Sequence, residues 1–115
     1  MKRSSGGQEH RELLPGTLHL LILRILARGP LHGYAISRRI KDASEEGLVI
    51  EEGSLYPTLN RMLVKGWLTA EWGISENNRK ARFYRLTPAG RKRLNRETTE
   101  FERLVRAIRL VMKSA

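Results

Sequence analysis

Apolar residues between positions 17 and 28 surround the axis of a predicted helix instead of forming one stripe. Thr17 offers an N-cap oxygen at its start, and Gly29-Pro30 ends it. A helix that is apolar on all sides must be buried on more than one side. Because the chain is short, we expect one side to pack inside the subunit and another to pack against a second subunit.

Two more helices follow in the pattern. The first is basic and amphipathic, begins near His32-Gly33 with His32 as its expected cap, and ends around Ala43. The second covers about residues 53–65, and its apolar stripe consists of Leu55, Leu59, Met62 and Leu63. Pro57 must lie in or just past the first turn of this helix, where a missing N–H is least costly.

The C-terminal half of the chain predicts a hairpin and a long helix. Residues 67–72 and 81–86 are aromatic-rich runs separated by a polar, turn-forming stretch. Thr87-Pro88 then supplies an N-cap and a first-turn proline for a helix that runs to about Lys113. Its apolar residues repeat at sevenfold spacing and gather towards the C-terminus, so this protruding helix needs a partner.

The order of these elements predicts a mainly α fold with a small β-hairpin. This is the order of a winged helix-turn-helix with a long C-terminal dimerisation helix. We expect residues 1–12 to form a flexible basic tail, residues 13–87 a DNA-binding winged helix-turn-helix domain, and residues 88–115 the dimerisation helix. The predicted homodimer interface draws on the first and last helices and consists of Leu18, Leu21, Ile22, Ile25, Leu94, Phe101, Leu104, Val105, Ile108 and Val111.

Charge points to a polyanionic partner. The chain has 22 lysines and arginines against 12 acidic residues, a formal net charge of +10. Neutralised nucleic-acid phosphates release condensed counterions, which favours binding of such a chain to nucleic acid. An anionic membrane is the alternative, but a surface helix would need a large apolar face beside its basic one. The most apolar run, residues 18–27, is too short to span a bilayer, so we expect no membrane insertion.

The sequence offers no apparatus for catalysis. It has no cysteine, which excludes disulfides and thiolate metal sites and is compatible with the cytoplasmic location that we expect. Its three histidines are scattered, Asp42 is its single aspartate, and His19 in the first helix is expected to be a hydrogen-bonded core or interface residue. No nucleophile with a nearby base, carboxylate pair or Gly-rich phosphate loop is present, so we predict neither an enzyme nor a metal or cofactor site.

Three sequence blocks carry a resemblance to a known family. They are His32-Gly33-Tyr34-Ala35-Ile36, then Gly53-Ser54-Leu55-Tyr56-Pro57-Thr58-Leu59-Asn60-Arg61-Met62, and finally Arg82-Phe83-Tyr84-Arg85-Leu86-Thr87-Pro88-Ala89-Gly90. The blocks resemble HGY-x-I, G-T/S-L-Y-P-x-L-x-R-L and R-x-Y-x-L-T-x-x-G of the PadR family of bacterial transcriptional regulators. Their order and separations also match, and the likeness runs from about Leu14 to Leu94.

The resemblance implies a homodimer that binds an inverted-repeat operator on double-stranded DNA, usually to repress transcription. In this family a small aromatic compound or drug sometimes releases the operator. The single helix after the wing is similar to the smaller subgroup of the family. In some small relatives a tryptophan on the last helix stacks against planar drugs, whereas Phe101 is the only aromatic residue of this helix.

Helical geometry places the polar residues of the third helix on its outer face, opposite Leu55 and Leu59. Arg61 suits a guanine edge and Asn60 an adenine edge, while hydroxyls and the cations of the hairpin suit phosphates. The candidate DNA-contact residues are Tyr34, Arg38, Ser54, Tyr56, Pro57, Asn60, Arg61, Arg79, Lys80 and Arg82. In the alternative interpretation these polar residues are only solvated, and the two tyrosines pack in the core.

Several functional alternatives stay open at this point. The chain could be a regulator without an effector, a module whose last helix recruits another protein, or a basic protein that coats any nucleic acid. Trp67 and Trp72 stand five residues apart, so we expect one in the core and the other near the dimer cleft, with ligand stacking as a further alternative.

Overall fold

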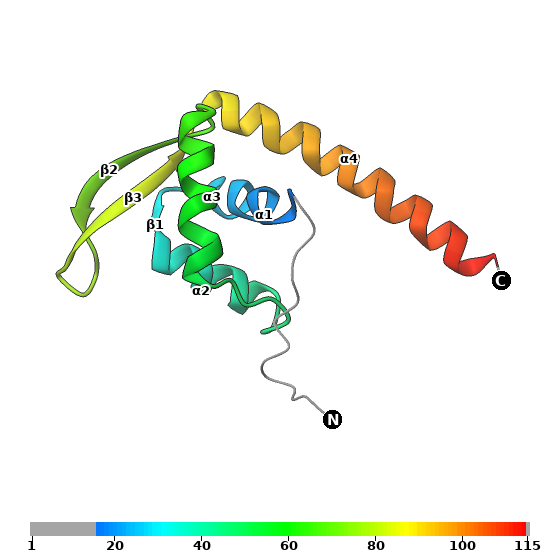
Figure 1. Ribbon diagram of the computed structural model, residues 1–115, viewed down its shortest axis with the longest axis horizontal. Helices are drawn as coiled ribbons and strands as arrows, with labels where there is room; N and C mark the ends of the chain where they lie inside the picture. The colour runs from blue at the N-terminus through cyan, green and yellow to red at the C-terminus, as the bar shows by residue number, and fades with distance from the viewer. Residues whose placement is uncertain (1–15, 115) are drawn as a thin grey trace.

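The computed structural model describes residues 16–114, so the predicted tail at residues 1–12 lies outside the described part. The chain forms α1 (Thr17–Leu26), β1 (Leu31–His32), α2 (Gly33–Ala43), α3 (Glu52–Val64), β2 (Leu68–Ile74), β3 (Lys80–Leu86) and α4 (Pro88–Lys113) (Figure 1). The predicted order of three helices, a hairpin and a long helix is confirmed. As expected, His32 caps α2, because its Nδ1 accepts a hydrogen bond from the Ala35 amide at 3.2 Å.

The sheet contains one strand that the sequence pattern did not predict. Its three antiparallel strands lie in the order β1-β3-β2, and β1 pairs Leu31 with Tyr84 and His32 with Phe83. Two residues are too few to show a period of two, so the pattern could not reveal β1. This short pairing ties the start of α2 to the hairpin.

Helix α1 lies at the centre of the core and contacts α2, α3, β3 and α4. Its residues Ile22 and Leu23 are fully buried, together with Ile36 of α2 and Leu59 of α3. The helix is therefore covered on several sides by its own subunit. This finding corrects two residues of the predicted dimer interface: Ile22 is 0% exposed and Leu94 4% exposed, so neither is available to a partner.

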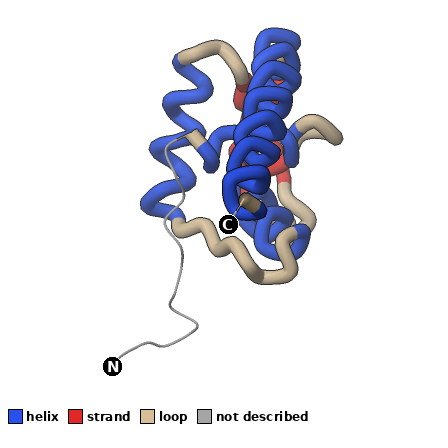
Figure 2. The backbone as a smooth tube through the Cα atoms, turned by 90° about the vertical axis from the view of Figure 1, so that its right-hand side faces the viewer, coloured by secondary structure: helices blue, strands red, loops and turns tan. Residues whose placement is uncertain are grey.

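Helix α4 is joined to the body at its N-terminal end. The Thr87 hydroxyl accepts a hydrogen bond from the Gly90 amide at 2.9 Å, and it lies 2.7 Å from the Gly66 carbonyl oxygen, to which it donates. The helix then runs away from the hairpin, and its C-terminal half stands clear of the other helices (Figure 1). Figure 2 views α4 nearly end-on, with its C-terminus in front of the body. Within the described residues, no helix is long and apolar enough to cross a bilayer.

A cluster of charged and aromatic side chains holds α4 against α1. His19 Nε2 lies 3.1 Å from Glu97 Oε1, Arg93 also pairs with Glu97, and the Glu97 side chain is only 12% exposed. The Arg93 guanidinium lies 4.9 Å from the centre of the Trp67 ring, and the His19 ring lies 5.3 Å from it. The hydrogen-bonded role expected for His19 is confirmed, and Trp67 is half-buried in this cluster.

We predict that Gly90→Ala destabilises the fold at the junction of the hairpin and α4. A Cβ at Gly90 would lie 2.2 Å from the Trp67 carbonyl oxygen, which is backbone and cannot swing away. Although alanine favours helices, the clash should lower the free energy of unfolding by about 1–3 kcal/mol. Urea denaturation at a fixed protein concentration measures this. Gly53→Ala is the control, since a Cβ there meets nothing within 4 Å; equal effects of the two changes would contradict the prediction.

Candidate nucleic-acid interface

The outer face of α3 presents the polar residues that the sequence pattern predicted. Leu55, Leu59 and Met62 point into the core. Their burial leaves Ser54, Pro57, Asn60 and Arg61 exposed on the opposite side of the helix. The side chains predicted to read base edges therefore lie together on one accessible surface.

Arg61 is held in place by a neighbour that the sequence reasoning did not single out. The buried Thr58 donates its hydroxyl to the Ser54 carbonyl at 2.8 Å, and Arg61 Nη2 donates to the Thr58 oxygen at 2.9 Å. This bond uses one of the five N–H donors of the guanidinium. Thr58 thus orients Arg61 along the outer face of α3, and only the i, i+3 spacing of the two residues could have suggested this contact.

The N-terminal turn of α2 supplies a second part of the surface. Tyr34 is 58% exposed, so its alternative placement in the core is wrong. Arg38 Nη1 donates a hydrogen bond to the Tyr34 hydroxyl oxygen at 3.1 Å. This bond raises the pKa of Arg38 above its ordinary value, so the guanidinium stays charged beside the phenol.

Tyr56 connects α3 with α2 and is also partly exposed. A Cβ at Gly33 would lie 2.6 Å from the Tyr56 hydroxyl oxygen, so the glycine lets the tyrosine ring lie against the start of α2. Burial, followed by the nearby charge of Glu52, raises the pKa of Tyr56 above its ordinary value. Its hydroxyl therefore stays protonated at neutral pH and can donate a hydrogen bond.

The hairpin of β2 and β3 forms the wing. Its loop is closed by hydrogen bonds between Ser75 and the residues that follow, including the Ser75 amide to the Arg79 carbonyl at 2.8 Å. Arg79, Lys80 and Arg82 are all exposed, as predicted for cations that approach a polyanion. Trp72 is exposed on the same hairpin, and Lys80 Nζ lies 5.2 Å from the centre of its ring.

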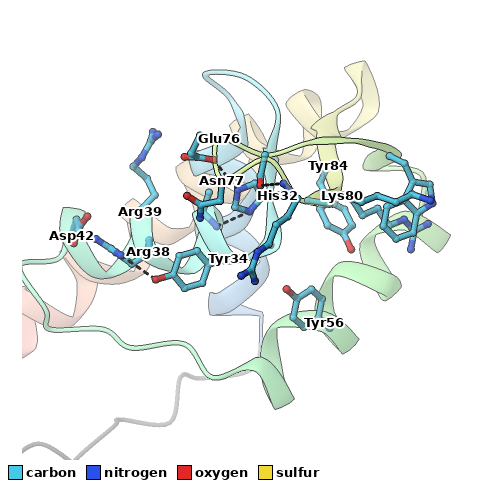
Figure 3. Close-up of a pocket in the computed structure, with 17 residues that line it drawn as sticks. His32, Tyr34, Arg38, Arg39, Asp42, Tyr56, Glu76, Asn77, Lys80 and Tyr84 are labelled. Atoms are coloured by element: carbon cyan, nitrogen blue, oxygen red, sulfur yellow. Dashed lines mark hydrogen bonds and ion pairs between the residues drawn. The ribbon is translucent and has the colours of Figure 1, made fainter.

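A groove of about 910 Å³ lies between α2, α3 and the wing. In Figure 3, Tyr34 and Arg38 lie towards one end of the groove and Lys80 lies towards the other. Five cationic side chains line it, whereas Asp42 and Glu76 are its only acidic lining residues. The Glu76 backbone amide and then His32, at 3.4 Å from the carboxylate, lower the pKa of Glu76. The groove is therefore basic and suits an anionic ligand.

Of the ten candidate DNA-contact residues, six line this groove, namely Tyr34, Arg38, Tyr56, Arg79, Lys80 and Arg82. The other four, Ser54, Pro57, Asn60 and Arg61, are exposed on α3 outside the groove lining. The exposed apolar residues of α4 lie on a separate surface that runs away from the wing (Figure 1). Within residues 16–114, no three histidine, aspartate or glutamate side chains gather to hold a metal ion.

Comparisons with known proteins show a family match and a shared fold. Residues 22–96 match the model of the transcriptional regulator PadR-like family. The chain is 34% identical over 98 residues to the transcriptional regulator Rv3488 of Mycobacterium tuberculosis, covering 85% of this chain and 88% of the relative.

Solved structures share the fold. A transcriptional regulator from Clostridium thermocellum matches with a TM-score of 0.77 and 31% identity, over 85% of this chain and 95% of that chain. Bacillus subtilis PadR, solved in complex with operator DNA, matches with a TM-score of 0.65 and 24% identity, over 75% of this chain and 48% of that chain. The predicted winged-helix fold with a long C-terminal helix is confirmed.

Proposed function

The chain belongs to the PadR-like family of transcriptional regulators, and we propose that it represses transcription by binding an inverted-repeat operator as a homodimer. Family and fold are those of transcriptional regulators and not of enzymes. The observation that carries the proposal is the basic groove between α2, α3 and the wing, beside the exposed polar face of α3.

In this proposal α3 enters the major groove of the duplex. Arg61, oriented by Thr58, reads the O6 and N7 edge of a guanine, and Asn60 pairs with an adenine. Backbone phosphates are contacted by Tyr34 and Arg38 of α2 and by Ser54 and Tyr56 of α3. Pro57 packs on the edge of the major groove. Arg79, Lys80 and Arg82 of the wing bind phosphates next to the half-site.

The homodimer is proposed to form through α4. Its C-terminal half carries exposed apolar side chains at sevenfold and three- or four-residue spacing, which are Phe101, Leu104, Ile108, Val111 and Met112, with Val105 half-buried among them. The half-buried Leu18, Leu21 and Ile25 of α1 complete the proposed interface. A two-fold axis would then place two α3 helices in successive major grooves, roughly 34 Å apart.

Effector control is the second part of the proposal. Phe101 is 48% exposed on α4, and α4 packs against α1, whose outer apolar residues are only half-buried. The cleft that these helices would line in a dimer suits a small aromatic compound, which would release the operator by favouring a different subunit arrangement.

Arg61→Ala should reduce operator preference. Each good base contact is worth about 1–3 kcal/mol, so we expect roughly 5- to 150-fold weaker binding for each half-site of the preferred duplex and little change for a mixed-sequence duplex. The preferred duplex is selected from a random-sequence library with the unchanged protein, and affinities are measured by fluorescence anisotropy. Arg103→Ala is the matched control, because it removes the same charge from α4. Equal losses in both variants and on both duplexes would support a coating protein instead.

Ile108→Glu should separate the proposed dimer. Burying a carboxylate without a partner is costly, so we expect association to weaken by about 100-fold or more. Sedimentation velocity measures the shift towards monomer. Leu110→Glu is the control, because Leu110 is similarly exposed on α4 but lies about 200° around the helix from Ile108, at 100° per residue. A monomeric unchanged protein would overturn the dimer and favour a helix that recruits another protein.

An aromatic effector should weaken operator binding and change tryptophan fluorescence at the same ligand concentration. Couplings between sites are typically about 5- to 150-fold, and we expect a change of this size. A panel of neutral, cationic and anionic aromatic compounds is titrated into the protein alone and into its operator complex. If no compound changes operator affinity across the panel, the protein is an effector-independent regulator.

A further inference from the structure

The inner face of the wing continues the apolar face of the core beyond the helices. Directly opposed residues of an antiparallel pair share a face, and the faces alternate along a strand. Ala70 pairs with Tyr84, which is buried against the core. Two positions further out, Trp72 pairs with Arg82, and Ile74 pairs with Lys80 two positions beyond that. All of these residues therefore share the face that turns towards α3.

This outer part of the face is apolar and uncovered. Trp72 and Ile74 are each 64% exposed, although the same face is closely packed at Leu68. A tryptophan left in water forgoes a large burial energy, because its side chain covers about 150–250 Å². Solubility alone gives no reason for two large apolar side chains here, and such a surface indicates a partner.

Cations are interleaved with these apolar side chains. Lys80 Nζ lies 5.2 Å from the centre of the Trp72 ring, and the Arg82 guanidinium carbon lies 5.9 Å from the centre of the Tyr84 ring. Of the strand residues on this face, none is acidic. Trp72 also lines the basic groove, so the uncovered face opens directly onto the surface assigned to DNA.

Resting on the DNA binding proposed above, we infer that Trp72 and Ile74 pack against deoxyribose rings of the duplex while Lys80 and Arg82 bind the phosphates on either side. A nucleic-acid strand alternates anionic phosphates with apolar sugars, and this face alternates cations with apolar side chains in the same way. A second copy of the chain fits poorly, since two such faces would bring lysine and arginine against lysine and arginine. The partner must be anionic and partly apolar.

The two kinds of contact differ in their response to salt. A phosphate bound by lysine or arginine releases counterions, so each such contact adds about 0.9 to the slope of log affinity against log salt concentration. Burial of apolar surface releases no counterions, so its contribution to the affinity should change little with salt concentration. Trp72 should therefore change the affinity without changing the slope, whereas Lys80 should change both.

The experiment measures duplex binding by fluorescence anisotropy from about 50 to 300 mM KCl. Each lost phosphate contact should reduce the slope of log affinity against log salt concentration by roughly 0.9. The duplex is the one selected by the unchanged protein. We expect Trp72→Ala to bind at least about 10-fold more weakly at every salt concentration, with an unchanged slope, as burial of half an indole implies. Lys80→Ala should reduce the slope by about 2 for two wings. Leu110→Ala is the control, because it removes an exposed apolar side chain from α4 and should leave both quantities unchanged.

A fluorescence measurement reports the contact directly. In the Trp67→Phe protein, Trp72 is the single tryptophan of the chain, and its emission should change saturably with added duplex. Thermal unfolding checks that each variant is folded. Ile74→Ala should also weaken binding at every salt concentration with an unchanged slope, but by a smaller factor than Trp72→Ala. Trp72→Phe should retain most of the affinity.

The outcomes separate this inference from the proposed function. If Trp72→Ala binds within twofold of the unchanged protein and Trp72 emission ignores the duplex, the inference is wrong while DNA binding stands. If Trp72→Ala instead alters sedimentation of the protein without DNA, the face belongs to a second copy and the inference is also wrong. If the unchanged protein selects no duplex and binds none, both the proposed function and the inference fail.

Discussion

The burial of α1 is the constraint on which the rest of the structure depends. This helix is apolar around its whole circumference, and one neighbour could not remove all of that surface from water. Helices α2, α3 and α4 and strand β3 all pack against it. Since α3 and α4 both pack on α1, the surface proposed to face DNA and the helix proposed to pair with a second copy are held in a fixed relation. A close-packed interior transmits such relations because it deforms little.

Helix α4 divides into a half that is anchored and a half that is not. Near its start, Gly90 packs against the Trp67 backbone, and Glu97 is paired with His19 and Arg93 while its side chain is largely buried. A buried carboxylate is tolerated only with such partners. Beyond Phe101 the helix leaves the body, and no element of the described chain covers its apolar stripe. The anchored half sets the direction in which the free half is presented.

Much of this arrangement follows from local sequence rules. Local sequence signals predicted the ends of the helices to within about two residues. These signals are the 3.6-residue period, the stop at Gly29-Pro30 and the cap at Thr87. The exposed face of α3 could be predicted because it lies opposite the apolar stripe of the same helix. The burial of Ile22 and Leu94 within their own subunit could not be predicted, because an apolar residue looks the same in sequence whether its neighbour belongs to the same subunit or to another. This distinction depends on tertiary packing.

The candidate site shows the same division between local and tertiary information. Residue type and helix face identified Tyr34 and Arg61, but the support of Arg61 by Thr58 depends on side-chain rotamers. Trp72 was not assigned to the site because its neighbours are set by the register of β2 against β3, which a stretch of alternating residues leaves open. The spacing of five to Trp67 was a poor guide, since Trp67 precedes the strand and lies between His19 of α1 and Arg93 of α4.

Charge links the two proposed surfaces. Each chain carries a formal charge of +10, so two copies repel one another unless the cations stand away from the contact or are neutralised. On α4 the arginines at 103, 106 and 109 lie on the flank or far side of the helix from the stripe of Phe101 and Ile108, which keeps them in water. On the other side of the molecule, duplex phosphates would neutralise the groove and the wing. Binding of DNA then removes part of the repulsion that opposes association, and by linkage association strengthens DNA binding by the same factor. The proposed dimer of this basic chain would therefore be tightened further by a duplex that carries two correctly spaced half-sites.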